Sequence, residues 1–122
     1  MNIIIDSNIL ISALIRDSVT RKIIVESGYK FYYPEIALHE IRNYKDLILD
    51  KSGITELEYT ELFNRLLRCV TLVPDEQIRL KLKGAETELG KIDPDDVVFL
   101  AAALAIDNSI IWSEDKDFER QN

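Results

Sequence analysis

The chain has 122 residues, a length typical of one domain with one hydrophobic core, so we expect a single domain over residues 1–122. Hydrophobic residues make up 47% and charged residues 30% of the sequence, which excludes a disordered or low-complexity chain. The formal net charge of −7 disfavours simple electrostatic binding to nucleic acid, unless the acidic residues first bind a cation.

The sequence gives no sign of export or membrane insertion. No apolar run approaches the ~18 residues of a membrane-spanning helix, and the first apolar strand begins at Asn2, which leaves no room for a basic leader. The single cysteine, Cys69, excludes an internal disulfide. We therefore expect a cytoplasmic protein with no membrane partner.

The order of the expected elements predicts the fold class. Ile3-Ile4-Ile5 is an uninterrupted β-branched run, typical of a central parallel strand that is covered on both faces. Pro34 suits the first turn of a helix, and Thr55 and Glu58 fit a capping box. We expect strands at about residues 3–5, 30–33, 69–73 and 109–112, and helices at about residues 8–15, 18–28, 35–50, 55–68, 75–90 and 93–107. This alternation predicts an α/β fold, with a parallel sheet and helices on both of its faces.

Acidic residues follow two of these strands, and ligands of such sheets bind outside the carboxyl ends of the strands. Asp6 ends the first strand, although a cap for the helix that begins near Asn8 is an equal explanation. Asp115 and Asp117 follow the last strand, where an ordinary turn explains them nearly as well.

Glu40 is the most diagnostic acid by helical geometry. At about 100° per residue it falls inside an apolar arc of its helix, where a carboxylate needs a compensating charge such as a metal ion. A glutamate at the edge of the arc is the alternative. The arc consists of Ile36, Ala37, Ile41, Tyr44, Leu47 and Ile48. His39 lies on the opposite side and is expected at the surface.

The run Asp93-Pro94-Asp95-Asp96 has a structural explanation: Asp93 caps a helix and the other acids favour its first turn. The apolar segment 97–106 that follows is apolar on all sides, so we expect this helix to be largely buried, with its N-terminus close to the sheet. Asp96 is our candidate ligand, and Asp93 ranks second.

These acids predict a hard oxygen site. Carboxylates without a cysteine cluster, in a chain with one histidine, suit Mg²⁺ or Mn²⁺ better than zinc. Such a cation lowers the pKa of bound water and orients a phosphate for in-line attack. A modest basic patch could complement the acids, and its candidates are Arg16, Arg21, Lys22, Arg42 and Lys45.

Four segments, in this order, resemble those of PIN-domain ribonucleases, and the resemblance covers nearly the whole chain. They are the opening Ile-Ile-Ile-Asp-Ser-Asn, the helical Glu40, the segment Asp-Asp-Val-Val-Phe-Leu-Ala-Ala-Ala-Leu-Ala that contains Asp96, and the closing Ile-Ile-Trp-Ser-Glu-Asp-Lys-Asp-Phe that contains Asp115. The chain ends four residues after Phe118, so we expect a final edge strand to be short or missing.

The resemblance implies a three-layer α/β/α sandwich around a central parallel sheet of four to five strands. It implies an endoribonuclease that depends on Mg²⁺ or Mn²⁺, often the toxin of a VapBC-type toxin–antitoxin pair and often a homodimer. The implied catalytic metal ligands are Asp6, Glu40, Asp96 and Asp115. The implied supporting residues are Ser7, Asn8, Asp93, Ser113 and Asp117.

Other functions stay open at this point. Standalone RNA-processing nucleases share the same motifs. Asp6 after a buried strand also resembles the start of haloacid-dehalogenase-type phosphatases, although Asn8 stands where that family has its second aspartate. A receiver-type signalling domain would need its aspartate on a later strand. A non-catalytic binding module with the same fold is the last alternative, and the complete set of four acids weighs against it.

Overall fold

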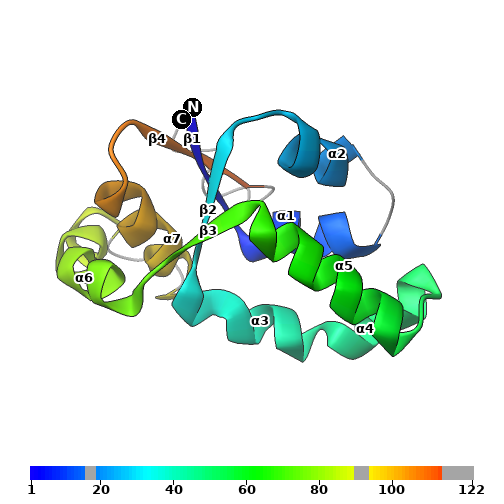
Figure 1. The fold of residues 1–122 in the computed structure, drawn as a ribbon. Helices are drawn as coiled ribbons and strands as arrows, with labels where there is room; N and C mark the ends of the chain where they lie inside the picture. The colour runs from blue at the N-terminus through cyan, green and yellow to red at the C-terminus, as the bar shows by residue number, and fades with distance from the viewer. Residues whose placement is uncertain (16–18, 90–93, 114–122) are drawn as a thin grey trace.

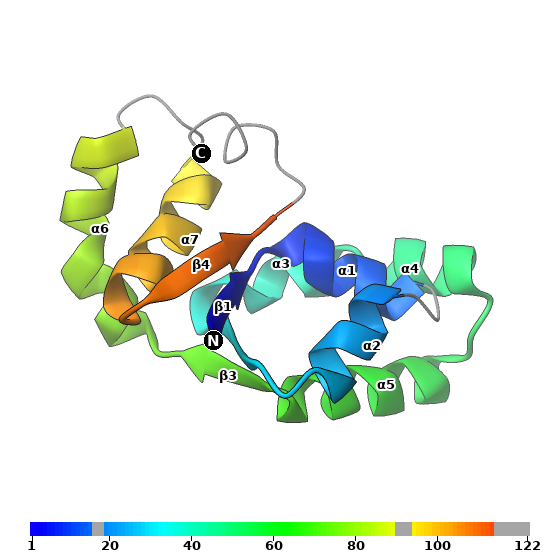
Figure 2. The same ribbon diagram turned by 90° about the horizontal axis from the view of Figure 1, so that it is seen from above.

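The protein is an α/β fold in which helices flank a four-stranded, all-parallel sheet (Figures 1 and 2). Its structure is a computed structural model that describes residues 1–15, 19–89 and 94–113; for residues 83–89 and 94–96 it describes the backbone only. The predicted fold class is therefore confirmed, with four strands among the described residues.

The strands are β1 (Asn2–Ile5), β2 (Lys30–Pro34), β3 (Val70–Val73) and β4 (Ser109–Trp112). The helices are α1 (Ser7–Ile15), α2 (Val19–Glu26), α3 (Leu38–Asn43), α4 (Lys45–Ser52), α5 (Glu56–Arg68), α6 (Asp75–Leu89) and α7 (Pro94–Ala105), and a 3-10 turn, η1 (Glu35–Ala37), precedes α3. Most of these bounds lie within two residues of the sequence predictions.

The strand β1 is at the centre of the sheet. The strand order is β3-β2-β1-β4, so β1 pairs with β2 on one side and with β4 on the other. Ile3 pairs with Phe31 and with Ile110, and the three isoleucines of β1 are buried. The interpretation of this run as a central strand covered on both faces is confirmed.

The two faces of the sheet are covered by different sets of helices. On one face α7 packs against β1, β2 and β4, and α6 packs on α7, whereas α1, α2 and α5 lie on the other side (Figure 2). The helix α7 is less completely buried than its sequence predicts. Val97, Phe99 and Ala101 face the core, but Leu104 is exposed. Its position between the sheet and α6 leaves part of its surface uncovered.

The single helix expected over residues 35–50 is wrong in detail. After Pro34 the chain forms η1, then α3, and a break at Tyr44 (φ −96°, ψ 5°) separates α3 from α4. Ala37, Ile41 and Ile48 are buried as expected, but Tyr44 is 48% exposed. A uniform turn of about 100° per residue does not hold across a 3-10 turn and a break, so the expected apolar arc does not form one continuous face.

The ends of α4 and α5 follow their sequence signals. Gly53 has φ +67° directly after α4, a left-handed conformation that glycine adopts at low cost. Glu58 donates its backbone N–H to Thr55 Oγ1 at 3.1 Å, and Thr55 donates its own to Glu58 Oε1 at 3.2 Å. The predicted capping box is confirmed.

The structure also bears on the expected position of His39 and on the search for a membrane-spanning helix. His39 is exposed, as expected. In the part of the chain that the structure describes, no helix has the length and apolar character needed to cross a membrane.

The central strand is expected to contribute most to stability. Ile4→Ala removes a fully buried side chain from β1 and should lower the free energy of unfolding by about 2–5 kcal/mol, measured by urea titration. Ile110→Ala is the matched control, because Ile110 lies on β4, at the edge of the described sheet, and is 53% exposed. Equal losses in the two variants would contradict the central position of β1.

Candidate active site

Asp6 connects β1 directly to α1. Its side chain is only 5% exposed, and its Oδ1 accepts the backbone N–H of Ile9 at 2.9 Å. Its carbonyl accepts the N–H of Leu10, the first backbone hydrogen bond of the helix. Asp6 is therefore the N-cap of α1, where the helix dipole also favours a negative charge. The cap that sequence reasoning held as an alternative is present.

The other carboxylate oxygen of Asp6 faces the end of β4. The backbone N–H of Asp6 donates to the carbonyl of Trp112 at 3.3 Å, which continues the pairing of β1 with β4. Ser113 follows directly, and its hydroxyl donates to Asp6 Oδ2. The parallel register thus brings together two residues that are distant in the sequence, and the predicted supporting residue Ser113 lies beside Asp6.

Ser7 connects this junction to Glu40. Ser7 is the first residue of α1 and is buried, and its hydroxyl donates to Glu40 Oε2. Glu40 lies on α3 and is half-buried. The structure therefore places Glu40 next to the residue that follows Asp6, although the continuous helix from which its position was predicted does not form.

Tyr33 is a site residue that sequence reasoning missed. It is fully buried near the end of β2, and its phenol oxygen lies 2.6 Å from Ser7 Oγ and donates to the carbonyl of Ala37 at 2.9 Å. Burial raises the pKa of Tyr33 above its ordinary value; the hydrogen bond with Ser7 lowers it, and the charges of Glu40 and Asp6 raise it further. The only sequence signal was a polar hydroxyl at the carboxyl end of an apolar strand.

The remaining predicted residues are only partly described. Asn8 is exposed in the first turn of α1. Asp96 lies in the first turn of α7, one turn before Phe99, whose ring packs on Tyr33 with centroids 5.9 Å apart. Because a crossover helix runs antiparallel to its strands, the N-terminus of α7 is at the carboxyl edge of the sheet. Asp93, Asp115 and Asp117 lie outside the described residues.

The described donor set fits a hard divalent cation. Asp6 and Glu40 contribute carboxylate oxygens, the ligand type that Mg²⁺ and Mn²⁺ prefer. Each carboxylate can accept about four hydrogen bonds or ligands, and the bonds from Ile9 and Ser113 use two of these positions on Asp6. Two carboxylates of low exposure on either side of Ser7 repel each other, and a cation compensates this cost. No three His, Cys, Asp or Glu side chains cluster among those that the structure describes.

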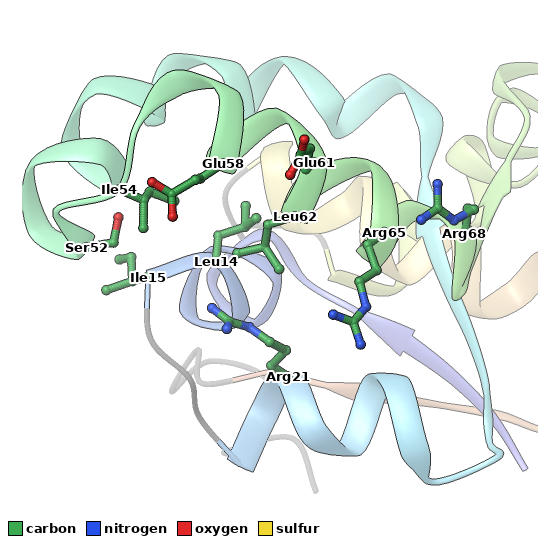
Figure 3. Close-up of a pocket in the computed structure, with 10 residues that line it drawn as sticks. All are labelled: Leu14, Ile15, Arg21, Ser52, Ile54, Glu58, Glu61, Leu62, Arg65 and Arg68. Atoms are coloured by element: carbon green, nitrogen blue, oxygen red, sulfur yellow. The ribbon is translucent and has the colours of Figure 1, made fainter.

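One described cavity lies away from the candidate acids. It has a volume of about 710 Å³ and lies at the end of α1 opposite to Asp6, between α1, α2 and α5 (Figure 3). It is lined by Leu14, Ile15, Arg21, Ser52, Ile54, Glu58, Glu61, Leu62, Arg65 and Arg68. Arg21 Nε donates to the carbonyl of Ala13 in the last turn of α1, at 2.7 Å. None of the candidate acids lines this cavity.

The candidates for the expected basic patch come from different helices. Arg21 and Lys22 are on α2, whereas Arg42 is on α3 and Lys45 is on α4. Lys45 forms an ion pair with Glu56, with 3.5 Å between Nζ and Oε1. Arg16 lies outside the described residues.

The fold and the site together define an α/β protein with carboxylates at the carboxyl edge of a parallel sheet. A family model described as PIN domain matches residues 4–121. The chain therefore belongs to the PIN-domain family, whose fold is a nuclease fold and whose nucleases commonly use divalent metals. A search of curated proteins found no match.

The cap can be separated from the charge of Asp6 by two substitutions. Asp6→Asn and Asp6→Ala both remove the charge, but only asparagine keeps an oxygen that accepts the N–H of Ile9. We expect Asp6→Ala to be less stable than Asp6→Asn by about 1 kcal/mol in urea unfolding. Equal stabilities would show that the hydrogen bond to Ile9 contributes nothing to the fold.

Proposed function

We propose that this protein is an endoribonuclease that depends on Mg²⁺ or Mn²⁺, with Asp6, Glu40, Asp96 and Asp115 as metal ligands. The observation that carries the proposal is the link from Asp6 through Ser7 to Glu40 at the carboxyl edge of the sheet. Membership of the PIN-domain family supports nuclease chemistry at this edge.

The residues of the site are oriented before any substrate arrives. Asp6 is fixed by the N–H of Ile9 and by the hydroxyl of Ser113, and Glu40 is held by Ser7. A bound divalent cation supplies Lewis-acid chemistry, which activates water and neutralises a phosphate. Hydrogen bonds that fix carboxylates in this way typically preserve metal affinity and activity. Asp96 and Asp115 complete the proposed set from the first turn of α7 and from the segment after β4.

RNA as the substrate is consistent with the charge of the protein only under one condition. A net charge of −7 repels a polyanion, so productive binding of RNA requires that the cation first neutralises the carboxylates. We infer an ordered process in which the cation binds before the RNA.

The resemblance of the four sequence segments supports a more specific role, which we also propose. In this role the chain is a VapC-like toxin in the cytoplasm, a homodimer, and the partner of a cognate antitoxin protein. A standalone RNA-processing nuclease is the alternative. A neighbouring reading frame that encodes a small DNA-binding antitoxin would favour the toxin, and its absence would favour the alternative.

The phosphatase alternative is disfavoured by the described site. That chemistry needs a second acid two residues after the nucleophilic aspartate, but Asn8 is an amide and is exposed. Asp6 is also tied to the start of α1 by the N–H of Ile9.

Loss of activity without loss of fold is the main test of the nuclease. Asp6→Asn and Asp96→Asn should each lower Mn²⁺-dependent cleavage of a labelled RNA by more than the 10–100-fold that is typical of losing an outer-shell partner. Asp46→Asn, on an exposed position of α4, is the control and should cut like the parent. If the folded site variants cleave as fast as the parent, the nuclease site is wrong.

Metal binding can be measured without any substrate. Calorimetry should show that Mn²⁺ binds the parent and binds Glu40→Gln more weakly, because the amide removes an anionic ligand. Glu35→Gln changes an exposed glutamate of η1 and should leave the affinity unchanged. Unchanged affinity in Glu40→Gln would remove Glu40 from the site.

A further inference from the structure

We propose that Tyr33 is a positioning residue, which holds the Ser7 hydroxyl and, through it, the Glu40 carboxylate in the orientation that the metal site needs. The proposal rests on the function proposed above. It adds a residue that no sequence motif of the chain marks.

Tyr33 contacts three elements around the site, α1, η1 and α7. Its phenol oxygen lies 2.6 Å from Ser7 Oγ at the start of α1 and donates to the carbonyl of Ala37 at the end of η1. Its ring packs on Phe99 of α7, with centroids 5.9 Å apart and planes inclined by 55°. The side chain is fully buried. No other described tyrosine has hydrogen bonds of this kind among those that the structure gives.

The phenol oxygen is a fixed point, whereas the hydroxyl of Ser7 is not. The position of the phenol is set by two side-chain torsions, both restricted by burial, and the bond to Ala37 anchors its oxygen. A serine hydroxyl has three staggered orientations of similar energy. Contact with Tyr33 on one side and with Glu40 on the other selects one of them.

The hydrogen bonds of these groups are coupled. The two hydroxyl groups of Ser7 and Tyr33 carry two hydrogens, and these serve three contacts: Ser7 with Glu40, Ser7 with Tyr33, and Tyr33 with Ala37. A change at one contact therefore redistributes the hydrogens at the others. Such networks are not sums of independent pairs, and a double-mutant cycle measures their coupling.

A purely structural role is the competing explanation, because a buried tyrosine hydroxyl usually finds a partner wherever it lies. That role predicts a loss of stability only. The positioning role predicts a loss of metal affinity in protein that is still folded, because the oxygen of Tyr33 orients a group that orients a ligand.

Tyr33→Phe is the test, because it keeps the ring on Phe99 and removes only the oxygen. Calorimetry with Mn²⁺, at a temperature where circular dichroism shows folded protein, should give an affinity about 10-fold weaker than that of the parent. The kcat for RNA should fall while KM changes little. Tyr59→Phe is the matched control: it removes the hydroxyl of another buried tyrosine, which packs on Phe63 in α5, and should change neither quantity.

Ser7→Ala provides the second arm and does not depend on the behaviour of Tyr33→Phe. It should weaken Mn²⁺ binding to a similar extent, and adding Tyr33→Phe to it should cost little more. Unchanged Mn²⁺ affinity in folded Tyr33→Phe would overturn the proposal. So would a double variant whose fold-loss of Mn²⁺ affinity equals the product of the losses in the two single variants. A parent that binds Mn²⁺ but does not cut RNA would contradict the nuclease alone, and the affinities would still decide the role of Tyr33.

Discussion

The site depends on the direct junction between β1 and α1, where a buried central strand becomes a helix with no intervening loop. Pairing with β2 and β4 fixes the register of β1 in the sheet. The N–H of Asp6 extends the pairing with β4 to Trp112. The next residue already belongs to α1. The backbone therefore leaves little freedom in where Asp6 and Ser7 point, and every other described group of the site is oriented by contact with one of them.

The junction places two carboxylates, those of Asp6 and Glu40, in a buried or half-buried environment. Asp6 is compensated by the N-terminus of α1 and by Ser113, and Glu40 by Ser7. Each of these donors is neutral, and each stabilises the charged form of the carboxylate that accepts from it. A divalent cation would add a positive charge next to both carboxylates, so the arrangement suits metal binding. Burial raises the pKa of Tyr33, and the charges of Glu40 and Asp6 raise it further.

Features that depend on local patterns are predicted correctly from the sequence. Features that depend on contacts between distant segments are not. The run Ile3-Ile4-Ile5 and the capping box at Thr55 are local, and both are correct. The break at Tyr44 is not visible in a pattern that assumes one regular helix. Glu40 therefore does not lie in the expected apolar arc, and its place in the site is shown by its hydrogen bond with Ser7. Tyr33 looks like an ordinary core residue until the pairing of β1 with β2 is known.

The two described acids differ in what they say about function. Asp6 caps α1, so the fold alone is a sufficient reason for an aspartate at this position, with or without chemistry. Glu40 is half-buried on α3 beside the Asp6 junction, and its carboxylate accepts a hydrogen bond from the hydroxyl of Ser7. A second carboxylate at this place, next to that of Asp6, is the ligand type that the proposed divalent cation prefers.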